Sequence, residues 1–268
     1  MKKTITAVIF TLILTMFGGN VFADSHDKAK VRIVHASPDA PAVDITVNGD
    51  TVVENAGFKA ATDYLMVPAG EHEVAIYAAG TIADGNPVLT ATLAVEAGKA
   101  YTVVANNTLA NLELAVLNDD MMTTAGKTKV RVGHFSPDAP AVDVAVTGGD
   151  VLFPNAPFQA VTDYAEVDPG TLDLEVRVAG TEDVVLSLPD TELKADMIYS
   201  VLAVGLAGGE PALDVIVLAD PSTSTMPSEL PKTGTGGLTG LFMNTLPILF
   251  IGVGIAFFFY KRKNLFQS

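Results

Sequence analysis

The sequence predicts an all-β protein built from two tandem β-sandwich domains of immunoglobulin-like type. Three observations lead to this fold class. A stretch of about ninety residues occurs twice, its apolar residues alternate with polar ones, and turn-forming residues recur every dozen or so positions. We expect seven or eight short strands and no substantial helix in each copy. The chain has no cysteine and no tryptophan, so the likeness to immunoglobulin domains is one of architecture only.

The duplication sets the domain organisation. Residues 30–47 read KVRIVHASPDAPAVDITV, and residues 129–146 read KVRVGHFSPDAPAVDVAV. Each copy is long enough to form a hydrophobic core of its own. We therefore predict a first repeat at 29–118, a polar linker at 119–128, a second repeat at 129–219 and a Pro/Ser/Thr-rich spacer at 220–229.

The pattern within each repeat has a period of two residues. In the segment 172–178, LDLEVRV, apolar and charged side chains alternate strictly. Val43 and Ile45 likewise alternate with Asp44 and Thr46. Such alternation is typical of antiparallel strands with one face in the core and the other in solvent, so Asp44 is expected to face solvent.

The N-terminus has the features of a secretory signal peptide, residues 1–23. Two lysines precede an apolar stretch, and the segment ends in the small residues of Val21-Phe22-Ala23. Cleavage between Ala23 and Asp24 is expected. The apolar stretch is shorter than the roughly 20 residues that a membrane span needs, which argues against an uncleaved anchor.

The C-terminus combines a short motif, an apolar run at 241–260 and a basic tail at 261–268. Twenty residues of helix span about 30 Å, the thickness of a bilayer core, so the run predicts a transmembrane helix. Lys261-Arg262-Lys263 would keep the tail in the cytoplasm. The alternative is a plain single-pass membrane protein. The motif consists of Leu230, Pro231, Lys232, Thr233 and Gly234.

This arrangement resembles the cell-wall sorting signal of Gram-positive surface proteins, and the pentapeptide matches that signal at each defined position. The resemblance implies that a sortase cuts after Thr233 and joins its carboxyl group to the peptidoglycan. Before that step, the membrane would hold the precursor. The protein would then be secreted and anchored to the cell wall.

Charge and composition narrow the function further. The formal net charge is −15, and the five basic residues at the two ends leave 11 basic and 31 acidic groups in residues 24–233. A body this acidic should repel nucleic acid. The absence of cysteine excludes disulfides, thiolate catalysis and cysteine-ligated metal centres.

The repeated string VR-x-x-H-x-SPDAPAVD carries a second resemblance. It is similar to the bacterial domain of unknown function 4397, here in two copies at about 29–118 and 128–219. That family occurs mainly in secreted and surface proteins and has no established activity. The resemblance therefore implies a location and leaves the biochemical role open.

The SPDAP motif allows three interpretations. A histidine, a serine and an aspartate within five residues suggest a hydrolase, although no oxyanion site or acid behind the histidine is evident. The aspartates and the histidine could instead bind calcium, although no Asp-x-Asp-x-Asp run is present. The favoured interpretation is a structural turn whose side chains cap backbone groups. The residues concerned are His35, Ser37, Asp39 and Asp44 in the first repeat and His134, Ser136, Asp138 and Asp143 in the second.

These observations together predict a sortase-anchored surface protein without catalytic activity. Its modules would have a structural role or a role in adhesion and ligand binding at the cell wall. No cofactor is expected, calcium being the alternative, and a surface hydrolase is the less favoured function. The expected partners are sortase, the membrane before sorting and peptidoglycan afterwards.

Overall fold

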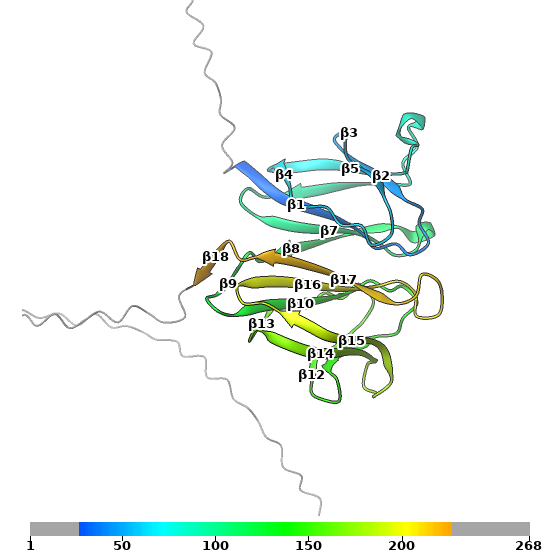
Figure 1. The fold of residues 1–268 in the computed structure, drawn as a ribbon. Coiled ribbons are helices and arrows are strands. Elements are labelled where there is room, and N and C mark those ends of the chain that lie inside the picture. The colour runs from blue at the N-terminus through cyan, green and yellow to red at the C-terminus, as the bar shows by residue number, and fades with distance from the viewer. Residues whose placement is uncertain (1–26, 227–268) are drawn as a thin grey trace, which may run out of the picture. The chain divides into compact units, whose positions relative to one another are not determined.

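The computed structural model describes residues 27–226, which form two β-sandwiches of the same topology (Figure 1). The first repeat has one sheet of strand order β4-β1-β7-β8 and a second of order β3-β2-β5-β6. Strand β1 pairs antiparallel with β4 and parallel with β7. Its strands are β1 (Lys28–His35), β2 (Val43–Val47), β3 (Asp50–Ala56), β4 (Leu65–Pro68), β5 (Gly70–Ala78), β6 (Leu89–Val95), β7 (Ala100–Asn106) and β8 (Glu113–Asp119).

The second repeat reproduces this arrangement. Its sheets have the orders β13-β10-β16-β17 and β12-β11-β14-β15, and β10 runs parallel to β16 as β1 does to β7. The predicted all-β sandwich is confirmed, and its eight strands per repeat agree with the seven or eight expected. The strands are β10 (Thr128–His134), β11 (Val142–Val146), β12 (Val151–Ala156), β13 (Ala165–Val167), β14 (Gly170–Val178), β15 (Val184–Leu193), β16 (Met197–Val204) and β17 (Asp214–Pro221).

Two single-turn 3-10 helices lie entirely within the described residues, both in the first repeat. They are η2 (Ile82–Asp84) and η3 (Leu109–Asn111). Within 27–226, no helix is long and apolar enough to cross a membrane. The predicted signal peptide, the sorting motif, the apolar run at 241–260 and the basic tail lie outside the described residues.

Each sandwich buries apolar side chains between its two sheets, and a further apolar cluster joins the two repeats. The first repeat contributes Val34 on β1, Ala36 just after β1, Val104 on β7 and Leu117 on β8. We call it the shared core. Val34 and Val104 lie on the faces of β1 and β7 that point away from the sandwich core, so these two strands are covered on both sides. The second repeat contributes Phe135, Leu202, Val204, Ile216 and Leu218.

The predicted linker and spacer are more than polar connections. Each contains a short strand, β9 (Met122–Thr124) and β18 (Ser224–Met226), and the two pair in parallel. The spacer is therefore hydrogen-bonded to the linker about 100 residues before it. The alternation of the sequence could not reveal a three-residue pairing of this kind.

The expectation that Asp44 faces solvent is wrong. Asp44 and Thr46 are buried, and so is Asp143 in the second repeat. The reason is local. The β2–β3 ladder has an irregularity near Asn55, which has a positive φ of 50°, and the Asp44 carboxylate accepts the Asn55 N–H that the ladder leaves unpaired.

Candidate functional site

The SPDAP segment of each repeat follows directly after a buried strand that ends in histidine. His35 and His134 are 2% and 0% exposed. His35 Nε2 lies 3.2 Å from the carbonyl oxygen of Pro41, and His134 Nδ1 lies 2.9 Å from that of Ala156. Because a carbonyl only accepts, these nitrogens carry the protons. Burial lowers the pKa of both histidines, so both rings are neutral at pH 7.

The serine and aspartate of the motif bond to each other, and the aspartate also bonds to a distant loop. Ser37 Oγ lies 3.5 Å from Asp39 Oδ1, and the matching distance between Ser136 and Asp138 is 3.3 Å. Asp39 accepts the backbone N–H of Leu109, the first residue of η3, at 2.7 Å. The carboxylate thus satisfies a donor that the helix cannot pair internally.

Asp138 plays the same part with two donors. It accepts the N–H groups of Ala207 at 2.7 Å and Gly208 at 3.0 Å. Partial burial alone would raise the pKa of Asp138, but the hydrogen bonds from Gly208 and Ala207 outweigh burial and lower it. In both repeats the SPDAP aspartate holds the loop that follows β7 or β16.

The second aspartate of each motif holds two other loops. Asp44 accepts the N–H groups of Asn55 and Gly80, both at 2.7 Å. Asp143 accepts those of Asn155 at 2.6 Å and Gly180 at 2.9 Å, and these bonds lower the pKa of Asp143. Each carboxylate oxygen is therefore already paired with a backbone donor.

This geometry does not assemble a Ser-His-Asp triad from the motif. His35 bonds to Pro41 rather than to Ser37, and Ser37 is completely buried. Among residues 27–226, no group of three or more His, Asp or Glu side chains is placed to hold a metal ion. The carboxylates of Asp39 and Asp44 bond to different loops, so the structure does not bring the proposed calcium ligands together.

The structure contains a charged cluster that the sequence analysis did not single out. Arg32 on β1 donates two hydrogen bonds to the Asp220 carboxylate of the second repeat, at 3.0 and 2.8 Å. Arg131 on β10 forms an ion pair with Asp119 of the first repeat. Both arginines are almost fully buried, at 5% and 2% exposed. Two charge pairs thus lie buried beside the shared core.

A tyrosine stacks on each of these arginines. The guanidinium carbon of Arg32 lies 4.4 Å from the centre of the Tyr64 ring, and that of Arg131 lies 4.6 Å from the Tyr164 ring. Tyr64 also donates a hydrogen bond to Asp119 at 2.7 Å. Burial raises the pKa of both tyrosines, so both hydroxyls stay protonated, and that of Tyr64 remains able to donate to Asp119.

The sequence carries a signal for this cluster. Arg32 and Arg131 occupy the same place in the duplicated string, 99 residues apart, and each lies between two apolar residues. Strand alternation would place such a residue in solvent, so the signal is the repetition of the arginine, and burial of its charge then requires an opposite charge. What the sequence could not supply is the partner, because Asp220 lies 188 residues from Arg32.

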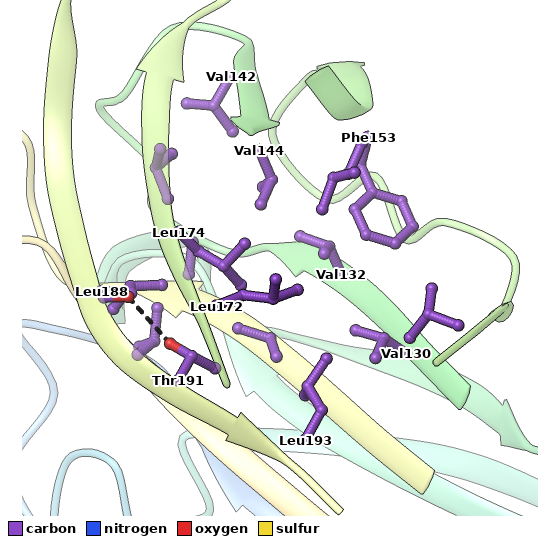
Figure 2. Close-up of a pocket in the computed structure, with 16 residues that line it drawn as sticks. Val130, Val132, Val142, Val144, Phe153, Leu172, Leu174, Leu188, Thr191 and Leu193 are labelled. Atoms are coloured by element: carbon purple, nitrogen blue, oxygen red, sulfur yellow. Dashed lines mark hydrogen bonds between the residues drawn. The ribbon is translucent and has the colours of Figure 1, made fainter. Parts of the chain in front are cut away.

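The second sandwich encloses an apolar cavity of about 50 Å³ between its sheets (Figure 2). Val132, Val144, Leu174 and other aliphatic side chains line it, and Thr191 is its one polar residue. The Thr191 hydroxyl donates to the carbonyl oxygen of Leu188 at 2.9 Å, drawn as the dashed line in Figure 2. A cavity without a free polar group cannot orient a polar ligand. We therefore assign it to packing and not to binding.

Comparison with protein families identifies the two repeats. The model of a family described as "Domain of unknown function (DUF4397)" matches residues 29–145 and 145–230. The chain belongs to this family. The tandem copies expected from the repeated string are thereby confirmed, and the family's name assigns no activity. Comparison with curated proteins finds no match.

Solved structures that resemble this DUF4397 protein do so only distantly. A candidate cell adhesion protein from Bacteroides eggerthii is 11% identical, with 76% of this chain and 98% of that chain covered, at a TM-score of 0.24. Another from Bacteroides ovatus is 9% identical, with coverage of 75% and 99%, also at 0.24. A CBM26 module of Eubacterium rectale Amy13K, solved with maltoheptaose, is 12% identical, with coverage of 74% and 97%, at 0.22. Similarity at this level carries no functional argument.

Proposed function

We propose that this DUF4397 protein is a secreted surface protein of a Gram-positive bacterium that sortase anchors to peptidoglycan. The observation that carries the proposal is the C-terminal sequence. Leu230-Pro231-Lys232-Thr233-Gly234 precedes an apolar run of membrane-spanning length and a basic tail, and the N-terminus has the features of a signal peptide. Each of these features is needed for such anchoring, and they occur in the required order.

The two repeats then act as a non-catalytic module in a structural or adhesive role. Support comes from the way the SPDAP side chains are used. Asp39, Asp138, Asp44 and Asp143 all accept backbone N–H groups. Side chains committed to holding loops are suited to fixing the shape of a surface. They are poorly suited to chemical turnover, which needs a group free to exchange protons or to attack.

The fold suggests which end of the module faces outward. Strands β1 and β10 run from the end that carries the linker to the end that carries the SPDAP segments, about 26 Å for the eight residues of β1. Strand β18 pairs with β9 at the linker end (Figure 1). A chain anchored beyond β18 would therefore hold the linker end toward the wall and present both SPDAP loops to the surroundings.

Anchoring is tested by changing the sorting motif. Thr233→Ala should move the protein from the wall fraction to the membrane fraction or the medium, because the scissile carbonyl belongs to Thr233. Lys232→Ala is the matched control, since that position of the motif is variable, and it should leave the wall fraction unchanged. Wall-linked Thr233→Ala protein, released only by wall-digesting enzymes, would refute the proposal.

Orientation is tested by cysteine labelling, because the native chain has no cysteine. Ala110 lies on η3 at the SPDAP end, Ala97 lies between β6 and β7 at the linker end, and both are exposed. On intact cells, a bulky maleimide should label Ala110→Cys several times faster than Ala97→Cys. On protein released from the wall, the two rates should be equal. Equal rates on cells would contradict the proposed orientation and leave the anchoring itself intact.

A further inference from the structure

The contacts between the two repeats are reciprocal. Arg32 of the first repeat pairs with Asp220 of the second, and Arg131 of the second pairs with Asp119 of the first. Arg32 and Arg131 are equivalent residues of the duplication, and so are Asp119 and Asp220, at the ends of β8 and β17. Each repeat therefore offers an arginine to the other and receives one in return.

A second pair of contacts follows the same rule. Lys59 of the first repeat forms an ion pair with Asp214 of the second. Gln159, the equivalent of Lys59, donates a hydrogen bond to Glu113, the equivalent of Asp214. Reciprocity of this kind is the property of an isologous interface, in which two copies of one surface meet about a two-fold axis. The polar part of the interface would suit two identical repeats.

The shared core departs from this symmetry. Where the first repeat has Val34 and Ala36, the second has Gly133 and Phe135. A Cβ atom added to Gly133 would lie 2.9 Å from both the Leu202 side chain and the Phe135 ring. Glycine is thus required at 133 to make room for Phe135. Both Phe135 and Ala36 are completely buried.

The neighbouring strand also carries a larger side chain in the second repeat than in the first. Leu202 on β16 matches Val104 on β7, so the second repeat is again the bulkier side. Two copies of the second repeat would bring Phe135 and Leu202 together twice, and packed interiors do not absorb added volume without strain. Two copies of the first repeat would leave unfilled space, with Asn106 in place of Val204 on both sides.

We propose that this face is a specialised interface between unlike repeats. Its charges would fit two identical repeats, whereas the side-chain sizes at its centre fit only a first repeat against a second. The partner that fits the face of the first repeat is a second repeat, and neither repeat pairs with its own kind. The two repeats form one body through this interface rather than two independent modules on a linker. Two chains could associate through it only by exchanging unlike repeats.

The test uses the whole two-repeat protein with a protease site inserted in the turn at residues 125–127, between β9 and β10. After cleavage, the halves should remain together at micromolar concentration in gel filtration. Native mass spectrometry of a mixture of tagged and untagged cleaved protein should show exchange, with pairs of first and second repeats only. Separation of the halves would overturn the interface, and pairs of like repeats at comparable abundance would overturn its specialisation.

Two variants sharpen the result. Phe135→Ala removes the bulk that disfavours pairing between second repeats. The abundance of such pairs should therefore be at least tenfold higher than in the cleaved protein without the substitution. Leu202→Val, which installs the residue of the first repeat, is the milder change if Phe135→Ala fails to fold. Val217→Ala is the control, because Val217 is 52% exposed on β17, and it should leave the pairing unchanged. No increase with either core variant would contradict the proposed role of size.

Discussion

The cores of the two sandwiches differ although their topologies agree. In the first repeat, twelve buried residues from β1, β2, β5, β6 and β7 form one continuous cluster. In the second repeat, the buried apolar residues fall into two separate clusters of five and three residues. The space between the sheets differs accordingly, with a cavity of about 20 Å³ in the first repeat and about 50 Å³ in the second.

Small changes in side-chain size account for the difference. Ile33, Ile45 and Ile76 line the first cavity, and the equivalent residues of the second repeat are all valines. Each replacement removes one methylene group from the same interior. The comparison shows that a duplicated fold tolerates such losses, since the sheet registers persist while the packing loosens. The valines are Val132, Val144 and Val176.

Truncation of equivalent core residues should give the largest effect. Ile76→Ala should lower the free energy of unfolding by about 2–5 kcal/mol, because it opens a cavity in the tighter core. Val176→Ala removes fewer atoms from a site that is already loose, so its cost should be clearly smaller. Urea unfolding of residues 24–229 measures both. Equal losses would show that the two cores are packed equally well.

The buried histidines should make both repeats sensitive to mild acid. Their pKa values are lowered in the folded state, so between pH 6.5 and the folded pKa the unfolded chain binds protons that the folded chain does not. Stability should therefore fall as the pH drops below 6.5, by at most about 1.4 kcal/mol per pH unit for each histidine.

Urea unfolding between pH 7.5 and 5 measures this slope. His35→Gln and His134→Gln should each reduce it, and the double variant should nearly abolish it in this range. The aspartates titrate near pH 4 when unfolded and contribute only at lower pH. An unchanged slope in the double variant would rule out the histidines as its source.

The SPDAP aspartates should differ between the repeats. Asp138 accepts two backbone N–H groups and Asp39 accepts one, apart from the bond to the neighbouring serine. Asp39→Ala and Asp138→Ala should each lower the free energy of unfolding by about 0.5–2 kcal/mol, as the loss of a helix cap does. The loss should be larger for Asp138→Ala. Melting temperatures in millimolar calcium and in chelator provide the measurement.

The calcium arm separates the two interpretations of the motif. For a structural turn, the losses should be the same in both buffers. Calcium could instead raise the melting temperature of the unmodified protein but not that of the variant with both Asp39→Ala and Asp138→Ala. The carboxylates would then be ligands, because a bound ion stabilises the folded state by mass action.

Refilling the looser core should give the smallest effect. Val176→Ile restores a methylene beside the second cavity and should raise stability by up to about 1 kcal/mol. The mirror change, Ile76→Val, should cost about 0.5–1.5 kcal/mol. Urea unfolding should therefore show a higher free energy of unfolding for Val176→Ile and a lower one for Ile76→Val. A loss of stability with Val176→Ile would mean that the cavity is too narrow to accept the added group.

The sequence by itself determined the repeats, the two-sheet architecture and the position of the SPDAP motif. Apolar and polar residues that alternate with a period of two show which side of a strand is apolar. Two copies of one sequence pattern are expected to adopt the same fold. His72 on β5 fits the same alternation, since it is buried and its Nε2 lies 2.7 Å from the carbonyl oxygen of Pro68.

Only the tertiary structure decided what covers each face and what each polar side chain holds. Asp39 bonds to Leu109 and Arg32 to Asp220, partners 70 and 188 residues away along the chain. Strand periodicity describes a side chain's direction relative to its own strand, whereas pairing across sheets depends on how separate strands stack. The shared core, the reciprocal charge pairs and the pairing of β9 with β18 arise at that level, because each joins segments that no local pattern connects.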